Sequence, residues 1–180
     1  MKKLFLILCL SGGSILFSPN TVHAQMSLGI TGGLFNQGWS FDGERVSYNL
    51  FGLNIAGKYG FSDNKMRVGL NIGYYFDSES EDGETATYFT QPITALFEYS
   101  FTDNDFSPYA GIDAGIYRIG YSFDGESESE SEIGFAPAVG CNYNVSDKVA
   151  INLNIKYNYI LTEEIATTGI NANAGVVINF

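Results

Sequence analysis

GINANAGVVINF, residues 169–180, places an apolar side chain at every second position up to the last residue. Successive side chains of a strand point to opposite faces, so this stretch predicts a strand with one apolar and one amide-rich face. Only Val177 interrupts the pattern. A strand that stays amphipathic to its end needs a neighbour on both sides, and closure of a sheet into a barrel supplies both.

The same alternation recurs along the chain. Glycine, β-branched and aromatic residues accompany it, and no segment keeps a helical period. The pattern predicts eight strands, at about 26–35, 48–61, 66–77, 86–102, 107–121, 132–145, 149–161 and 168–180. We therefore expect an all-β fold, an eight-stranded antiparallel up-and-down β-barrel.

The predicted connections alternate in length. Short turns are expected at 62–65, 102–105 and 146–147, and longer polar loops at 36–47, 78–85, 122–131 and 162–167. Most of the 20 acidic residues of the chain lie in or beside the longer loops. Short turns at one end and long loops at the other are typical of transmembrane barrels of the outer membrane, whose turns face the periplasm.

Charged residues in the middle of strands all fall on the face opposite the apolar stripe. A lysine or arginine facing lipid near the bilayer centre would cost roughly 2–4 kcal/mol, so this face is predicted to line the lumen. Asparagines share it, because three strands repeat Leu-Asn-Ile with the asparagine opposite the two aliphatic residues. The predicted lumen polar network is Lys58, Arg67, Glu98, Asp113, Lys156, Asn54, Asn71 and Asn154. We expect its cations and carboxylates to pair, bridged by asparagine and water, because an unpaired buried charge is destabilising. An ion-selective pore is the alternative.

Aromatic residues gather near the strand ends and predict bands at the two membrane interfaces. The band at the loop ends is expected to include Tyr74, Tyr75, Phe76, Tyr121 and Phe123.

Residues 1–24 have the layout of a secretory signal peptide. Lys2 and Lys3 precede an apolar run, and small residues end at Ala24, which predicts cleavage before Gln25. Residues 25–180 are then one barrel domain with seven basic and twenty acidic side chains and no histidine. With an acidic excess and no basic stripe, no nucleic-acid partner is expected.

The segments 176–180 (VVINF), 91–101 (QPITALFEYSF) and 108–115 (PYAGIDAG) give the chain a family resemblance. It resembles the small eight-stranded outer-membrane β-barrels, similar to outer-membrane proteins A and X. The resemblance implies a monomer in the bacterial outer membrane, in contact with lipid, delivered by the secretion apparatus and inserted by the barrel-assembly machinery. It also implies that Phe180, Ile178 and Val176 form the assembly signal. Gly38-Trp39 keeps a secreted lipocalin-like barrel as an alternative, although lipocalins enclose an apolar face.

The sequence predicts no enzyme, no cofactor and no metal site. Residues 25–180 contain no histidine, so a serine or threonine nucleophile lacks its usual activating base and imidazole ligation is excluded. The acidic loops are the remaining candidates for a structural or surface-interaction role, such as adhesion or shielding toward an extracellular protein or surface; a narrow channel for ions or small solutes is the alternative. The Ser-Glu alternation at 126–132 predicts a hairpin that projects beyond the membrane. The candidate interaction residues are Glu79, Glu81, Asp82, Glu126, Glu128 and Glu130.

Overall fold

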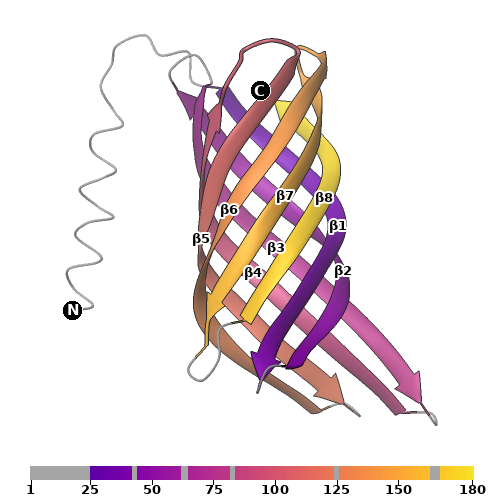
Figure 1. Ribbon diagram of the computed structural model, residues 1–180. Helices are drawn as coiled ribbons and strands as arrows, with labels where there is room; N and C mark the ends of the chain where they lie inside the picture. The colour runs from indigo at the N-terminus through magenta and orange to yellow at the C-terminus, as the bar shows by residue number, and fades with distance from the viewer. Residues whose placement is uncertain (1–24, 42–43, 62–64, 82–83, 124–125, 163–166) are drawn as a thin grey trace.

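The protein is an eight-stranded closed barrel (Figure 1). The computed structural model describes residues 25–41, 44–61, 65–81, 84–123, 126–162 and 167–180. The strands are β1 (Gln25–Phe41), β2 (Glu44–Phe61), β3 (Met66–Glu81), β4 (Glu84–Ser100), β5 (Phe106–Phe123), β6 (Glu126–Ser146), β7 (Val149–Leu161) and β8 (Thr167–Asn179). Each strand pairs antiparallel with its neighbours in the chain, so the predicted all-β up-and-down barrel is confirmed. Within the described ranges, no helix is long and apolar enough to cross a membrane.

The last strand closes the barrel. β8 pairs with β7 on one side and with β1 on the other, where the register runs from Ser27↔Asn179 to Gly38↔Thr168. The Phe180 amide donates to the Met26 carbonyl at 2.9 Å and extends this seam by one residue. The amphipathic end of the chain therefore has the two neighbours that its pattern predicts.

The two faces of the wall have opposite character. Leu53, Leu70 and Leu153 point outward and are 63%, 65% and 51% exposed. Asn54 and Asn71, each beside one of these leucines in the chain, point inward and are buried. An apolar exterior around a polar interior suits a barrel surrounded by lipid. The lipocalin alternative is wrong, because the enclosed face is the polar one.

Large side chains fill the lumen. Phe35, Tyr75 and Tyr117 are each 1% exposed, so Tyr75 belongs to the interior rather than to the aromatic band predicted at the membrane interface. Small residues of β6 make room for the rings. A Cβ atom on Gly134 would lie 2.8 Å from the Tyr117 ring, and one on Gly140 would lie 2.6 Å from the Tyr109 ring. The interior is therefore packed, as eight strands allow.

The strands run much further than the sequence predicts. β3 and β4 stay paired up to Glu81↔Glu84, and β5 and β6 up to Phe123↔Glu126. The long loops predicted at 36–47, 78–85 and 122–131 are therefore wrong, since most of their residues are strand. The hairpin predicted from the Ser-Glu alternation is confirmed: β6 spans 21 residues, whereas roughly 9–11 suffice to cross a membrane.

Candidate functional site

Four strands continue beyond the barrel as one sheet at the end opposite Phe180. The β2–β3 register ends at Phe51↔Phe76 and the β6–β7 register ends at Ile133↔Leu161, whereas the pairing of β3 with β4, β4 with β5 and β5 with β6 continues. We call residues 77–81, 84–90, 118–123 and 126–131 the projecting sheet. In Figure 1 these strand pairs extend furthest at the lower end of the barrel.

The outer face of the projecting sheet lies outside the lipid. Along β3 the outward positions change from Ile72, Tyr74 and Phe76 to Ser78 and Ser80. Hydroxyl groups pair across the β3–β4 ladder there, with Ser78 Oγ 2.9 Å from Thr87 Oγ1 and Ser80 Oγ 3.0 Å from Thr85 Oγ1. Because lipid selects apolar side chains, the membrane boundary falls just beyond Phe76.

The inner face combines an aromatic floor with acidic sides. The register places Tyr88 of β4 beside Tyr121 of β5, and Tyr121 beside Glu128 of β6. One step nearer the barrel, Ile119 lies beside Glu130. On the other side, β3 places Asp77 next to Tyr88. Since alternate residues share a face, acids of β3 and β6 flank the floor formed by β4 and β5.

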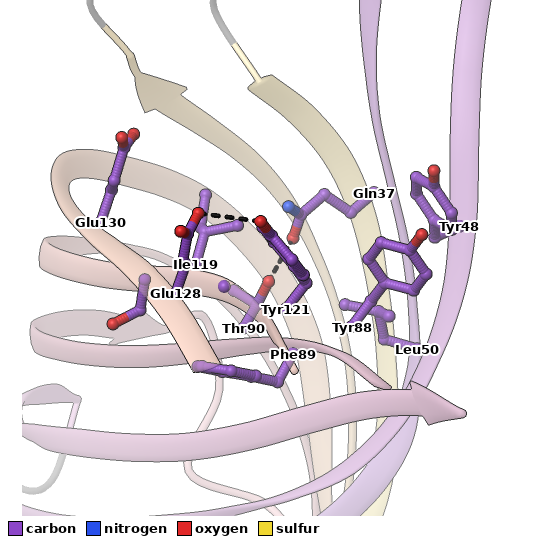
Figure 2. Close-up of a pocket in the computed structure, with 12 residues that line it drawn as sticks. Gln37, Tyr48, Leu50, Tyr88, Phe89, Thr90, Ile119, Tyr121, Glu128 and Glu130 are labelled. Atoms are coloured by element: carbon purple, nitrogen blue, oxygen red, sulfur yellow. Dashed lines mark hydrogen bonds between the residues drawn. The ribbon is translucent and has the colours of Figure 1, made fainter. Parts of the chain in front are cut away.

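A cavity of about 240 Å³, the mouth pocket, opens on this inner face (Figure 2). It draws residues from β1, β2, β4, β5 and β6, so strands far apart in the sequence form one concave surface. Its lining is Gln37, Tyr48, Leu50, Tyr88, Phe89, Thr90, Ile119, Gly120, Tyr121, Glu128, Ser129 and Glu130.

Specific contacts hold the walls of the mouth pocket. The Tyr121 hydroxyl donates to Glu128 Oε2 at 2.8 Å, and Thr90 Oγ1 donates to Gln37 Oε1 at 2.8 Å (Figure 2). The rings of Tyr48 and Tyr88 stack with centroids 4.6 Å apart and join β2 to the projecting sheet. The hydrogen bond and charge of Glu128 raise the pKa of Tyr121. Partial burial, together with Tyr88, raises the pKa of Tyr48. Both phenols therefore stay protonated at neutral pH.

The nearby arginine is engaged on the opposite face. Arg118 alternates with Ile119, so its side chain leaves the outer side of the sheet. There Arg118 Nε donates to Ser129 Oγ at 2.9 Å, and its guanidinium lies 5.9 Å from the centre of the Phe89 ring. Ser129 and Phe89 also line the mouth pocket, whereas Arg118 does not. Among the described residues, the Glu130 carboxylate has neither an ion-pair nor a hydrogen-bond partner.

The charged residues predicted in the lumen meet as ion pairs. Lys58 Nζ lies 2.6 Å from Glu98 Oε1, and Lys156 Nζ lies 2.6 Å from Asp113 Oδ2. Arg67 Nε is 3.7 Å from Glu98 Oε2, too far for a hydrogen bond. Lys58, Glu98, Asp113 and Lys156 thus share the buried middle of the barrel, and Arg67 lies between them and the turn end.

The asparagines mostly bond to one another rather than bridging the ions. Asn54 donates to Asn173 Oδ1 at 3.2 Å and also bonds to the Tyr75 hydroxyl. Asn173 donates to Asn154 Oδ1 at 3.0 Å. Asn71 has one long bond, 3.5 Å to Thr94 Oγ1. This amide chain forms a second polar layer beside the ion pairs.

Little space remains at this depth. One cavity beside Lys58 and Asp113 encloses about 30 Å³, and another beside Asn54 and Tyr117 about 10 Å³. A single water needs ~10–15 Å³, so these cavities hold a few waters and no file of hydrated ions. Both ends are wider: 240 Å³ at the mouth pocket and about 360 Å³ at the turn end near Arg67 and Asp105.

Five of the six predicted interaction residues lie on strands, not in loops. Glu79 is on β3, and Glu126, Glu128 and Glu130 follow one another on a single face of β6. Glu81 ends β3, but its side chain and the whole of Asp82 lie outside the described residues. The predicted assembly residues point outward from the last strand: Val176, Ile178 and Phe180 are 46%, 41% and 74% exposed.

Sequence reasoning missed the aromatic floor. Tyr48 and Tyr88 were not predicted as site residues, and Tyr121 and Phe123 were assigned to the membrane interface. The signal was present in the register: Tyr121 and Phe123 are an even number of residues from the lumenal Asp113, which places them on the inner face of the same strand. In the part of the chain that the structure describes, no three acidic, histidine or cysteine side chains are grouped to hold a metal ion.

Comparisons with known proteins agree with the geometry. The family profile described as "outer membrane protein beta-barrel domain" matches residues 5–180. Neisserial surface protein A is similar at 20% identity and a TM-score of 0.67, covering 87% of this chain and 97% of its own. Ail, the attachment invasion locus protein of Yersinia pestis, crystallised with the heparin analogue sucrose octasulfate, is similar at 21% identity and a TM-score of 0.57. The match covers 86% of this chain and 99% of Ail. The outer membrane protein OprG of Pseudomonas aeruginosa is similar at 16% identity and a TM-score of 0.53. The match covers 87% of this chain and 95% of OprG. No curated protein matches the chain.

Proposed function

Because the chain belongs to the outer membrane protein β-barrel domain family, we propose that it is a non-enzymatic surface-interaction protein of the outer membrane. In this proposal the barrel is an anchor and the inner face of the projecting sheet is the contact surface. Residues 1–24 direct export and are removed. The observation that carries the proposal is the mouth pocket, a concave aromatic and acidic surface beyond the apolar belt.

The packed lumen favours an anchor over a channel. Two ion pairs at 2.6 Å occupy the middle of the barrel together with four buried aromatic rings, those of Phe35, Tyr75, Tyr109 and Tyr117. The cavities between them hold only a few waters. A polar core that holds the barrel together explains these residues without any solute passing through.

The charge of the mouth argues for a different partner from that in the Ail structure. Sucrose octasulfate, the heparin analogue in that crystal, is a polyanion. Here an anion approaching the mouth pocket would meet Glu128 and Glu130, and like charges brought together are unfavourable. We therefore propose that polyanions are not partners of this surface.

Shortening one hairpin tests the proposed function. In the variant, residues 120–129 are replaced by an Asn-Gly turn, which keeps the Ile119↔Glu130 pair at the end of the ladder. Cells carrying either form are compared for adhesion to positively charged, neutral and sulfated surfaces. The full chain is expected to adhere more strongly than the variant to the positively charged or the neutral surface, and no more strongly to the sulfated one.

Equal adhesion of the two forms to every surface would contradict the surface role. Both forms should migrate faster on a gel when unheated than when boiled, as folded barrels do, which excludes misfolding as the cause of a loss. The paired substitution Asp103→Asn/Asp105→Asn, in the short turn between β4 and β5, is the matched control at the other end of the barrel.

A further inference from the structure

The mouth pocket has the size of a site for a side chain rather than for a whole metabolite. Its volume of about 240 Å³ is below the ~300–1,000 Å³ of most small-molecule sites. Leu50, Ile119 and the stacked rings of Tyr48 and Tyr88 provide apolar lining. A single aromatic or aliphatic side chain fits a lining of this kind.

Two carboxylates, those of Glu128 and Glu130, line one side of that cavity and belong to a regularly spaced column on β6. Glu126, Glu128, Glu130 and Glu132 occupy alternate positions of β6, about 6.8 Å apart along the strand. Glu79 lies on β3, about 14 Å away across three interstrand spacings of ~4.8 Å. An extended peptide repeats its own alternate side chains at the same ~6.8 Å, so basic residues two apart match the β6 column.

The described part of the chain leaves this charge open. Its ion pairs all lie in the lumen, and Arg118 is bound on the outer face. A second copy of the chain does not suit the carboxylates at the mouth pocket, because it would bring further acids against them. Residues 25–180 carry seven basic and twenty acidic side chains. Charge complementarity therefore selects a cationic partner, and the apolar cavity selects one that also carries a large side chain.

We propose that the mouth pocket binds a basic peptide segment of an extracellular protein. One aromatic or aliphatic side chain of the segment fills the cavity over Leu50 and Ile119, and lysines or arginines beside it pair with Glu128 and Glu130. Tyr48 and Tyr88 offer ring faces to the same cations. This assignment rests on the proposed function and names its partner class.

Calorimetry with a synthetic peptide tests the proposal. The probe repeats Lys-Ser-Lys-Ser-Phe-Ser, which places lysine and phenylalanine on the same face of an extended peptide. The full barrel is held in nanodiscs of zwitterionic lipid, with empty nanodiscs as the blank. We expect saturable binding that weakens with added salt, since exposed ion pairs are screened. Glu128→Gln/Glu130→Gln should weaken binding about fivefold, and Asp103→Asn/Asp105→Asn should leave it unchanged.

Two further comparisons separate charge from shape. Peptides with glutamate for lysine, or serine for phenylalanine, should bind much more weakly. Tyr88→Ala should weaken binding, whereas Tyr88→Phe, which keeps the ring, should not. Unchanged affinity of the basic peptide for Glu128→Gln/Glu130→Gln overturns the proposal. So does a glutamate peptide, or a neutral detergent, that binds as tightly as the basic peptide.

The two experiments together distinguish the basic-peptide proposal from the surface role on which it rests. If the basic peptide fails to bind but the hairpin-shortened cells still lose adhesion, the partner class is wrong and the surface role stands. If shortening the hairpin changes no adhesion, the surface role itself fails.

Discussion

Charged side chains in the lumen stabilise the barrel by pairing across it. Glu98 faces both Lys58 and Arg67, while Asp113 faces Lys156 alone, so three cations share two carboxylates. Both carboxylates are buried, at 6% and 4% exposed. Charges taken out of water in this way stay stable only while their partners remain.

Removing the shared carboxylate should therefore destabilise the barrel strongly. Glu98→Gln leaves Lys58 and Arg67 buried without an anion, and the expected loss in the free energy of unfolding is about 3–5 kcal/mol. Urea unfolding in lipid vesicles measures it. The double variant Lys58→Met/Glu98→Leu should lose less, because it removes both members of the Lys58–Glu98 ion pair. A loss below about 1 kcal/mol in Glu98→Gln would show that the pairing contributes little.

The pKa of Tyr121 in the mouth pocket depends on its acidic neighbour Glu128. Glu128 raises the pKa of Tyr121 through a hydrogen bond and its negative charge, both of which favour the protonated phenol. Glu128→Gln should lower that pKa toward the ordinary value of 10.0. A pH titration of ring-labelled tyrosine by NMR measures the change. An unaltered pKa would mean that the two side chains do not meet in solution.

Single strands record where the membrane ends. The outward positions of β3 are apolar up to Phe76 and carry hydroxyls at Ser78 and Ser80. The inward positions of the same strand pass from Arg67 in the lumen to Asp77 at the mouth pocket side. One strand thus meets lipid and then the exterior on its outer face, while its register with β4 stays the same from Met66↔Tyr99 to Glu81↔Glu84.

Two arginine substitutions on this strand should differ sharply. Leu70→Arg places a cation on the lipid face and should cost roughly 2–4 kcal/mol of folding free energy. Ser78→Arg places it on the same face beyond the apolar belt and should cost close to nothing. Unfolding in vesicles compares the two variants with the unchanged chain. Equal costs would contradict the membrane boundary placed just beyond Phe76.

The sequence predicts the transmembrane part of each strand but not its full length. In lipid the period of two is marked by strong contrast, as between Leu70 and Asn71, so the fold and the lumenal residues follow from it. Beyond the belt, serine alternates with glutamate and both faces are polar. Hydropathy then carries no strand signal, and glutamate has a low strand propensity, so residues 126–131 resemble a loop. Only pairing across the sheet, which no single strand reveals, keeps them extended.

The mouth pocket escapes prediction for a related reason. Its floor joins Tyr48 of β2 to Tyr88 of β4, and no local pattern links these residues. Their contact depends on how the β1–β2 and β3–β4 hairpins pack against each other beyond the barrel. The acids beside them were visible in the sequence as charge, but their arrangement on one face depends on the strands continuing.

The molecule as a whole is a plugged cylinder with two unlike ends. The turn end has a polar cavity near Arg67 and Asp105, the other end has the mouth pocket, and buried rings and ion pairs separate the two. We expect no steady conductance from the purified protein in planar lipid bilayers. Steady openings that Lys58→Met or Lys156→Met abolishes would contradict the plugged lumen and restore the channel alternative.

The surface role depends most directly on which end of the cylinder faces outward. The measurement is labelling of intact cells by a maleimide on a polyethylene glycol chain too large for porins, in a Cys141→Ser background that removes the free thiol. Ser131→Cys, on β6 of the projecting sheet, should react in intact cells. Asp103→Cys, in the β4–β5 turn, should react only after the outer membrane is opened. Labelling of Asp103→Cys but not Ser131→Cys in intact cells would contradict the account.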